Sequence, residues 1–441
     1  MTQLIHSSNV YKQTELTLRE DGTYHCLPTK DSIGSLPTLF SNNGTFLQEP
    51  NSYFFYLKVI KKAKDLNPCC RALLKYYQFL EDEQLAWDHF PPIKRLKPTY
   101  LFRSYLLKLV KHDELAHSTA NTYINQVKNF YLWTIHEGYL RIEREQEAPF
   151  KMEFVQVKNK GMLAHLRPTF TVETSDLRIK VPKNSDSKTV RPLSPLCRDS
   201  LNQLTTCLPL VSEELRLQVL LSIDTGLRIK EVSTFTLNAL DSAKSIAESK
   251  HRFEILLCPR KTGVQTKFSK PRTIEISSNL LQALNQYRIS ERRLQRANKL
   301  YKKIEQLKDK PQSTKQEKVN VLLQSKCHEP LFISQQGNPV SSGTIEARWT
   351  ELRAKIKEID SSFEHRFHDL RATYGTYRLY DLLEAKIPAG DCMELLMGWM
   401  GHNSENVTWK YLRYLKRKDA FKVKFGILDS IMHEALGVTD E

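Results

Sequence analysis

Four separated segments of this chain carry side chains whose chemistry suits a reaction at a phosphate group. Guanidinium groups bind phosphate oxygens in pairs, lysine and histidine donate or accept protons, and a tyrosine hydroxyl is an oxygen nucleophile. The set as a whole therefore points to nucleophilic attack on a phosphodiester by a tyrosine. The six candidate catalytic residues are Arg228, Lys261, His368, Arg371, His402 and Tyr411.

The spacing of the last pair constrains the local structure. His402 and Tyr411 are nine residues apart. At about 100° per residue they would lie on nearly opposite sides of a single helix. Asn403, Ser404 and Asn406 are residues that cap helices or form turns, so they favour a break between the two. We therefore expect His402 to end one element and Tyr411 to lie on a later one.

Each segment also has an ordinary structural explanation when it is taken alone. Arg228 follows Thr-Gly-Leu, which occurs at the start of many helices, and Lys261 could be a simple turn lysine. Two residues compete for predicted roles: Tyr414 is a rival nucleophile, and His365 is a rival to His368. The order and types of all six residues together favour the catalytic interpretation.

Composition limits the class of protein that carries these residues. A chain of 441 residues is expected to form two or three domains. The net charge of +16 and pI near 9.3 indicate a polyanionic partner, of which nucleic acid is the commonest. The eight cysteines form no CxxC pair, which argues against a structural zinc site. The first residues lack the pattern of a secretory signal, so we expect a cytoplasmic protein. The sequence has no run of about 18 apolar residues, so no transmembrane helix is expected.

The first half of the chain is predicted to be mainly helical. Residues 1–50 lack clear periodicity and are expected to be a loosely structured lead-in, with a short strand near Tyr24–Leu27 and a possible accessory role. Helices are expected within 51–145, in 71–85, from Thr99, and over 118–136. Residues 146–190 read as an extended linker with one strand pair, near 170–172 and 179–181.

One helix of this half carries a polar stripe. Asn121, Asn125 and Lys128 recur at helical spacing within 118–136. Such a stripe could lie in a DNA major groove, with asparagine contacting adenine and lysine contacting phosphate. A solvated helix face explains the same spacing, so these three are candidate DNA-binding residues with an equally simple alternative.

The second half, 191–441, is predicted to mix helices with a small sheet. Helices are expected at 195–208 and 212–223, and strands at 252–258 and 272–276 with Lys261 between them. Residues 287–318 are strongly basic and are expected to be a solvent-facing helical insertion or a DNA-contacting arm. An apolar stripe in 427–436 is expected to be a docking helix.

These motifs resemble those of the tyrosine recombinase, or phage integrase, family. Its TGLRxxE box is similar to Thr225–Glu231, its hairpin lysine to Lys261, its HxLR box to 368–371, and its GHxxxxxTxxY box to 401–411. The resemblance implies a mainly α fold with a small antiparallel sheet. It further implies a helical, SAM-like core-binding domain at 51–145 and a mixed α/β catalytic domain at 191–441. The sequence departs from many members at Ala372, where they carry a second histidine.

The resemblance also implies a role for each residue. Tyr411 attacks the scissile phosphate and gives a 3′-phosphotyrosine, with His368 as the base. Arg228 and Arg371 hold the non-bridging oxygens. Lys261 protonates the leaving 5′-oxygen, and His402 donates a hydrogen bond to the phosphate. Because the phosphotyrosine conserves the bond energy, no ATP is expected to be required. Because two arginines hold the phosphate, no metal or other cofactor is expected either.

The function implied is site-specific DNA recombination, for integration or excision of a mobile element. The expected partners are double-stranded DNA with specific recombination sites, further copies of the chain in a tetramer, and accessory proteins. The expected location is cytoplasmic, at the nucleoid. Two alternatives stay open: a type IB topoisomerase-like DNA-relaxing enzyme, and a non-catalytic DNA-binding regulator.

Overall fold

The described part of the chain forms two compact units in a computed structural model. It covers residues 1–11, 14–18, 22–28, 32–63, 65–158, 169–179, 194–246, 249–309, 322, 324–401 and 408. One unit holds the described residues before 192 and the other holds those after it. Each unit has its own hydrophobic core.

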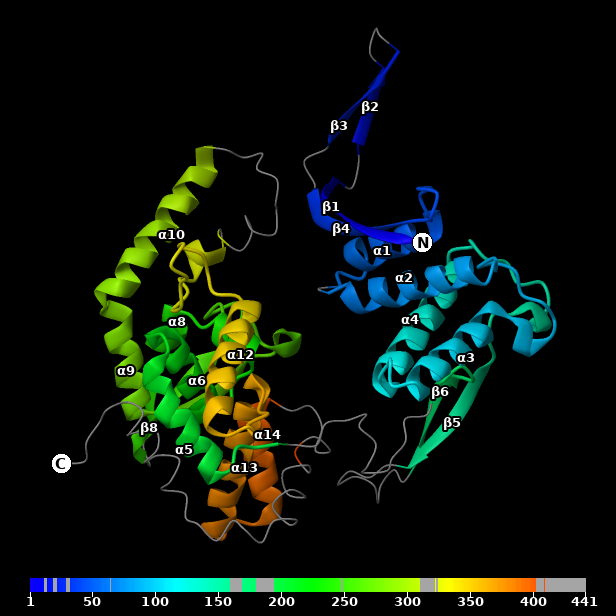
Figure 1. Ribbon diagram of the computed structural model, residues 1–441. Helices are drawn as coiled ribbons and strands as arrows, with labels where there is room; N and C mark the ends of the chain where they lie inside the picture. The colour runs from blue at the N-terminus through cyan, green and yellow to red at the C-terminus, as the bar shows by residue number, and fades with distance from the viewer. Residues whose placement is uncertain are drawn as a thin grey trace. The chain divides into compact units, whose positions relative to one another are not determined.

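The first unit begins with four strands rather than a loose lead-in. β1 pairs with β4 and β2 pairs with β3, both antiparallel. Figure 1 shows the β2–β3 hairpin standing clear of the helices of its unit. β4 is anchored because Leu36 and Leu39 are buried in the helical core, and Asn51 bonds both backbone groups of Leu39 at 2.7 and 2.9 Å. The strands are β1 (Gln3–Tyr11), β2 (Thr14–Leu18), β3 (Tyr24–Pro28) and β4 (Ser32–Phe40).

The predicted helices of this unit are confirmed, and an aromatic core holds them together. Tyr76 and Tyr131 are fully buried and share a hydrogen bond of 2.6 Å. Phe102 and Phe130 pack against the same rings. Large aromatic side chains bury much apolar area each, so this cluster stabilises the whole unit. The helices are α1 (Gln48–Val59), α2 (Asn67–Asp82), α3 (Pro98–Lys111) and α4 (His117–His136), with short 3₁₀ turns η1 (Lys94–Leu96) and η2 (Glu145–Glu147).

The expected strand pair of the linker exists with a different partner. β6 (Thr169–Ser175) contains the predicted strand near 170 and pairs antiparallel with β5 (Met152–Lys158). Ile179, expected in the second strand, is buried in the helical core together with Leu177. Core burial of these side chains outweighs strand pairing there, so this stretch is part of the first unit.

The second unit packs helices around a three-stranded antiparallel sheet. The two predicted strands are confirmed as β8 and β9, and a third, β7, extends the sheet in the order β7-β8-β9. The central helix α6 is buried along nearly its whole length. The elements up to the end of the sheet are α5 (Arg198–Cys207), η4 (Leu208–Leu210), α6 (Glu213–Thr225), α7 (Ile229–Ser233), α8 (Leu237–Asp241), β7 (Lys244–Ile246), β8 (Ser249–Leu257), η5 (Lys267–Ser269) and β9 (Arg272–Ser277).

Further helices complete the unit and carry the rest of the predicted site. α13 packs against both α6 and α14, and Figure 1 shows α13 and α14 side by side. α14 also contacts β9. These helices are α9 (Ser278–Ile289), α10 (Glu291–Asp309), α12 (Ser342–Ile359), α13 (Phe367–Glu384) and α14 (Ala389–Met400).

The basic insertion is not simply solvent-facing. Arg293 is buried on α10 and donates to the carbonyls of Leu331 at 3.1 Å and Pro330 at 3.0 Å. Arg296 pairs with the buried Glu214 at 2.7 Å. The prediction of a solvent-facing helix was wrong for the face of α10 that carries Arg293 and Arg296, because their guanidinium groups bind acceptors of the protein itself. Residues on the opposite face of α10 are exposed.

Two further features are absent from the described residues. No described helix has the length and apolar character needed to cross a membrane. No cluster of three or more histidine, cysteine or acidic side chains suited to a metal ion occurs in the same ranges.

Candidate active site

A left-handed glycine places the first arginine of the predicted set. α6 ends at Gly226, which has φ of 66° and donates its N–H to the Ser222 carbonyl at 3.0 Å. A Cβ atom built at this glycine would lie 2.3 Å from Cδ1 of Tyr374 on α13. The backbone angle and the close ring therefore both require glycine here. The tight turn leaves Arg228 at the first position before α7, as the sequence predicted.

Replacing Gly226 by alanine should lower both stability and activity. The new methyl group must push Tyr374 away and strain the turn, which we expect to cost roughly 2–4 kcal/mol of unfolding free energy. Thermal and denaturant unfolding would measure this. Gly398→Ala is the matched control, because that helical glycine has open space around it and the substitution should stabilise by up to about 1 kcal/mol. Equal effects at both positions would contradict this account of the turn.

Arg228 is held between a carboxylate and a helix end. Its Nη1 lies 3.2 Å from Oε1 of Glu231, and its Nη2 donates to the Gly401 carbonyl at 3.3 Å. Its backbone N–H also donates to Oε2 of Glu231 at 2.8 Å. The side chain remains 21% exposed. The guanidinium is therefore fixed in position and still reachable from solvent.

Arg371 is more deeply placed. It is buried on α13 and donates to the carbonyls of Gly226 and Met400 through its two terminal nitrogens. These contacts bring together α13, the end of α6 and the end of α14. Because the guanidinium is planar, two anchored nitrogens fix the orientation of the whole group.

The two arginines therefore meet at the C-terminal end of α14. Arg371 binds the carbonyl of Met400, and Arg228 binds that of the next residue, Gly401. The last carbonyls of a helix lack partners within the helix and carry partial negative charge, so they attract cations. Two guanidinium groups gathered at one point form a positive site suited to an anion with several oxygens.

His368 lies in the field of both arginines. The residue is in part exposed, and its pKa lies below the ordinary value of 6.5. Partial burial is the largest cause, and the charges of Arg371 and Arg228 lower the pKa further while Asp369 opposes them. The imidazole is consequently neutral at pH 7, which is the form that accepts a proton.

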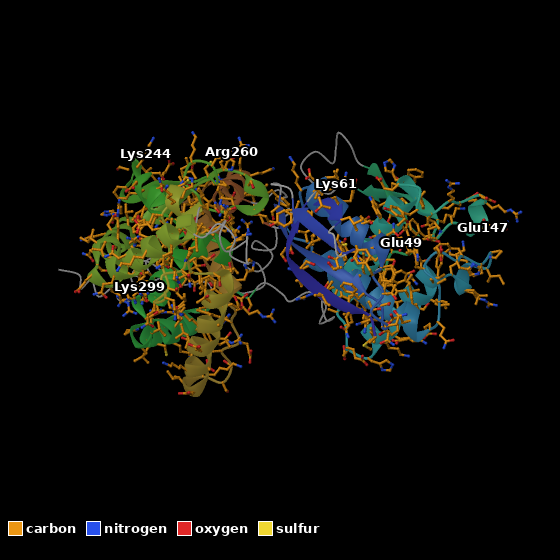
Figure 2. All side chains as sticks on the ribbon, turned by 90° about the horizontal axis from the view of Figure 1, so that it is seen from above. Glu49, Lys61, Glu147, Lys244, Arg260 and Lys299 are labelled. Carbon is orange, nitrogen blue, oxygen red and sulfur yellow. The ribbon has the colours of Figure 1, made fainter. Side chains whose placement is uncertain are left out.

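Lys261 occupies the predicted turn between β8 and β9. It is exposed, and neighbouring Arg260 lies at the periphery of the unit in Figure 2. Among the described residues no hydrogen bond or ion pair joins Lys261 to the other predicted site residues. The loop is nevertheless tied to the segment after α7, because Thr236 donates to the Thr262 carbonyl and the Gln265 N–H donates to Thr234 Oγ1 at 3.0 Å.

A buried cluster of charged side chains supports the turn at Gly226. Asp224, at the end of α6, is 2.8 Å from Arg252 on β8 and 3.8 Å from Arg378 on α13. It also accepts the Ser277 N–H at 2.7 Å. Burial would raise the pKa of Asp224, but the two arginines hold it below its usual range. The cluster joins α6, the sheet and α13, the elements that position Arg228 and Arg371.

His365, the rival to His368, makes contacts within the fold around the start of α13. Nδ1 of His365 lies 3.2 Å from the Ser194 carbonyl, and its own carbonyl accepts from Trp349 at 3.1 Å. Its ring packs edge-on against Phe363. His365 thus helps to fix the start of α13, while His368 lies one turn further along, where the arginines act on it.

Three predicted residues near the C-terminus, and the proposed docking stripe, lie outside the described residues. These are His402, Tyr411 and Tyr414, with 427–436. Within the described part, Gly401 ends α14 with φ of 60° and Thr408 is buried. Gly401 ends α14 at the residue before His402, and the break predicted between His402 and Tyr411 lies outside the described residues.

The polar stripe of the first unit lies on α4 as expected. Asn121, Asn125 and Lys128 are all half-buried. Oδ1 of Asn121 is buried without a hydrogen-bond partner among the described residues. The stripe remains a prediction as a DNA-binding surface.

Sequence reasoning missed two residues of this site. Glu231 belongs to the motif that contains Arg228, and the motif alone does not show that its carboxylate holds Arg228. Arg272 binds that carboxylate from β9 and received no mention as a site residue. Glu231 had a local signal, three residues after Arg228 on the same short helix. Arg272 had none, because the sheet brings it there from 41 residues away.

One family model matches the chain. Residues 196–418, just over half of the sequence, match the phage integrase family. The match spans all four described candidate residues and both undescribed ones. No curated protein matches the chain in sequence.

Several solved structures are similar at low identity. A XerH site-specific recombinase bound to difH substrate is 14% identical, with 87% of this chain and 92% of that chain covered and a TM-score of 0.44. A Tn1549 transposon integrase with circular-intermediate DNA is 15% identical, covering 82% and 94%, at 0.45. A lambda integrase dimer bound to a COC′ core site is 15% identical, covering 85% and 96%, at 0.43. The family assignment rests on the family model.

Proposed function

Since the chain belongs to the phage integrase family, the tyrosine-type site-specific recombinases, we propose that its second unit cleaves and rejoins DNA through Tyr411. The observation that carries this proposal is the pair of guanidinium groups at the end of α14, Arg228 and Arg371, beside a neutral His368. A scissile phosphate placed there would exchange the carbonyl partners of the arginines for its own non-bridging oxygens.

The reaction is a balanced transesterification. Oη of Tyr411 attacks phosphorus and gives its proton to His368, so that the tyrosine–phosphorus bond forms as the bond from phosphorus to the 5′-oxygen breaks. Lys261 protonates that leaving oxygen, and His402 donates to the phosphate. The arginines stabilise the additional negative charge of the pentacoordinate state. Attack by a 5′-hydroxyl of a partner strand reverses the step, so no external energy source or cofactor is required.

The assembly and setting of the reaction are part of the same proposal. The first unit would hold double-stranded DNA through the α4 stripe of Asn121, Asn125 and Lys128, with the net charge of +16 favouring the phosphate backbone. Four copies would act together on two specific recombination sites, with accessory proteins as further partners. The cellular setting would be the nucleoid, and the biological role would be integration or excision of a mobile element.

A plasmid experiment separates this function from its alternatives. The substrate is a supercoiled plasmid with two copies of a DNA site selected from random sequences by binding to the protein, and the control plasmid lacks them. A recombinase should give deletion or inversion products only from the first plasmid. Relaxation of both plasmids without exchange would instead indicate a topoisomerase-like enzyme. Binding without any strand cleavage would indicate a non-catalytic regulator.

The pH dependence of cleavage should report on His368. Because its pKa lies below 6.5, the base form predominates at neutral pH, and the cleavage rate should be flat there. The rate should fall about tenfold per pH unit below that pKa, as protonation removes the base. The rate of single-turnover cleavage would be measured from pH 5 to 8. The substrate would be a nicked duplex, whose short 5′-hydroxyl fragment is released after cleavage so that the covalent adduct is trapped.

Two substitutions identify which histidine titrates. His368→Gln should lower the plateau rate by roughly 10²–10⁴-fold and remove the acid limb. His365→Gln, the control three residues earlier, should keep the acid limb. An unchanged limb in the His368 variant would assign the base to another group.

A further inference from the structure

Arg272 is a buried arginine that lies next to the predicted site without belonging to the predicted set. It is the first residue of β9, and its side chain is only 9% exposed. Its Nη1 and Nη2 bind the two carboxylate oxygens of Glu231 at 2.6 and 2.7 Å. This two-pronged geometry is the strongest form of an arginine–carboxylate contact.

Glu231 connects Arg272 to Arg228. Each carboxylate oxygen of Glu231 takes one hydrogen bond from each arginine: Oε1 from the two side chains, and Oε2 from Arg272 and the Arg228 backbone. The side chain of Glu231 is 1% exposed. A carboxylate held in this way cannot turn or reach water, so its position sets that of Arg228.

Arg272 also packs against the end of α14. A Cβ atom built on Gly401 would lie 3.0 Å from Cδ and 3.4 Å from Nε of Arg272. Gly401 is the residue before His402 in sequence, and its carbonyl accepts from Arg228. The Nε of Arg272 is buried and has no hydrogen-bond partner among the described residues. The side chain therefore touches both the holder of Arg228 and the start of the segment leading to Tyr411.

The negative charge of Glu231 explains why a second arginine is needed beside Arg228. Glu231 is a buried carboxylate that competes with a phosphate for Arg228. With Arg272 present, the charge of Glu231 is already balanced, so the positive charge of Arg228 remains available to a substrate. Without Arg272 the uncompensated carboxylate would draw Arg228 into a full ion pair, since a buried charge without a partner is strongly unfavourable.

We propose that Arg272 is a positioning residue for strand cleavage: it neutralises Glu231 so that Arg228 is available to the scissile phosphate, and it fixes Gly401 ahead of His402 and Tyr411. This role rests on the proposed function, because Arg272 acts only through Arg228 and the other residues to which that function gives catalytic roles.

The test compares cleavage and binding in matched variants of the full chain. The probe is a nicked duplex that contains the same selected DNA site. Arg272→Met should bind this duplex within about threefold of the wild type and cleave it about 10–100-fold more slowly, the range found when supporting residues of a site are lost. Arg293→Met is the control, because it also breaks the ion pair of a buried arginine, with Glu329, but lies on α10 and contacts neither Arg228 nor Glu231.

A second substitution distinguishes positioning from a merely structural role. Adding Glu231→Gln to Arg272→Met removes the charge that captures Arg228, and should restore cleavage about tenfold relative to Arg272→Met. Loss of folding alone predicts no such recovery. Arg272→Lys keeps the positive charge without the two-pronged contact, so it should cleave at an intermediate rate. It replaces Arg272→Met in the comparison if the methionine variant does not fold.

The outcomes separate this inference from the function beneath it. If the wild type forms a covalent adduct but Arg272→Met cleaves equally fast, or the double variant shows no recovery, the positioning role is wrong and the proposed function stands. If Arg293→Met loses cleavage as severely as Arg272→Met, the effect is general destabilisation and the inference fails. If the wild type forms no adduct, the proposed function itself fails.

Discussion

Replacing Tyr411 by phenylalanine should abolish covalent attachment to DNA while leaving DNA binding intact. The substitution removes one oxygen atom, the nucleophile, and keeps the ring. We expect adduct formation to fall by at least about 10⁴-fold, since no other group at that position can attack phosphorus. Denaturing gel analysis of a trapped nicked duplex would measure the adduct, and a mobility shift would measure binding.

The control for this substitution is the neighbouring tyrosine. Tyr414→Phe removes the same atom three residues later, and it should leave the yield and rate of adduct formation within a few-fold of the wild type. The reverse pattern, with loss at Tyr414 and retention at Tyr411, would move the nucleophile and break the correspondence with the family motif.

Replacing Arg371 by lysine should have the next largest effect. Arg371 is buried and bonds the carbonyls of Gly226 and Met400 at once. Lysine keeps the positive charge but is a point charge without a planar fork, so it cannot hold both carbonyls and face a phosphate in the same geometry. We expect single-turnover cleavage to fall by about 10²–10³-fold, equivalent to about 3–4 kcal/mol of transition-state stabilisation.

Arg378→Lys provides the comparison on the same helix. Arg378 lies two turns after Arg371 and pairs with Asp224 and Asp381, outside the predicted phosphate site. Its substitution should lower the thermal stability and change cleavage by no more than a few-fold. If both lysine variants lose cleavage equally, the effect of Arg371 lies in the fold and not in the transition state.

The local part of the site could be predicted from the sequence. Thr-Gly-Leu-Arg predicted a tight turn, and Gly226 has the left-handed backbone that such a turn requires. His368 and Arg371 lie three apart on α13, as their spacing indicated. These predictions succeeded because they depend on neighbours within one turn of chain, where backbone geometry decides the outcome.

The parts that failed depend on contacts between distant segments. Residues 1–50 looked loosely structured apart from a short strand near Tyr24–Leu27, which is confirmed as β3, yet Leu39 of β4 is buried against the helices. The basic insertion looked solvated because charge suggests exposure, yet Arg293 and Arg296 bind acceptors brought to them by folding. Arg272 reaches Glu231 through the β8–β9 pairing, which no local pattern encodes.

The most direct test of the central claim is to identify the residue that becomes joined to DNA. The wild-type protein would be trapped on a nicked duplex and digested with protease and nuclease, and the nucleotide-linked peptide would be sequenced by mass spectrometry. We predict a single 3′-phosphotyrosine at Tyr411. A nucleotide on any other residue, or DNA cleavage without a protein-linked nucleotide, would contradict the assignment of Tyr411 as the nucleophile.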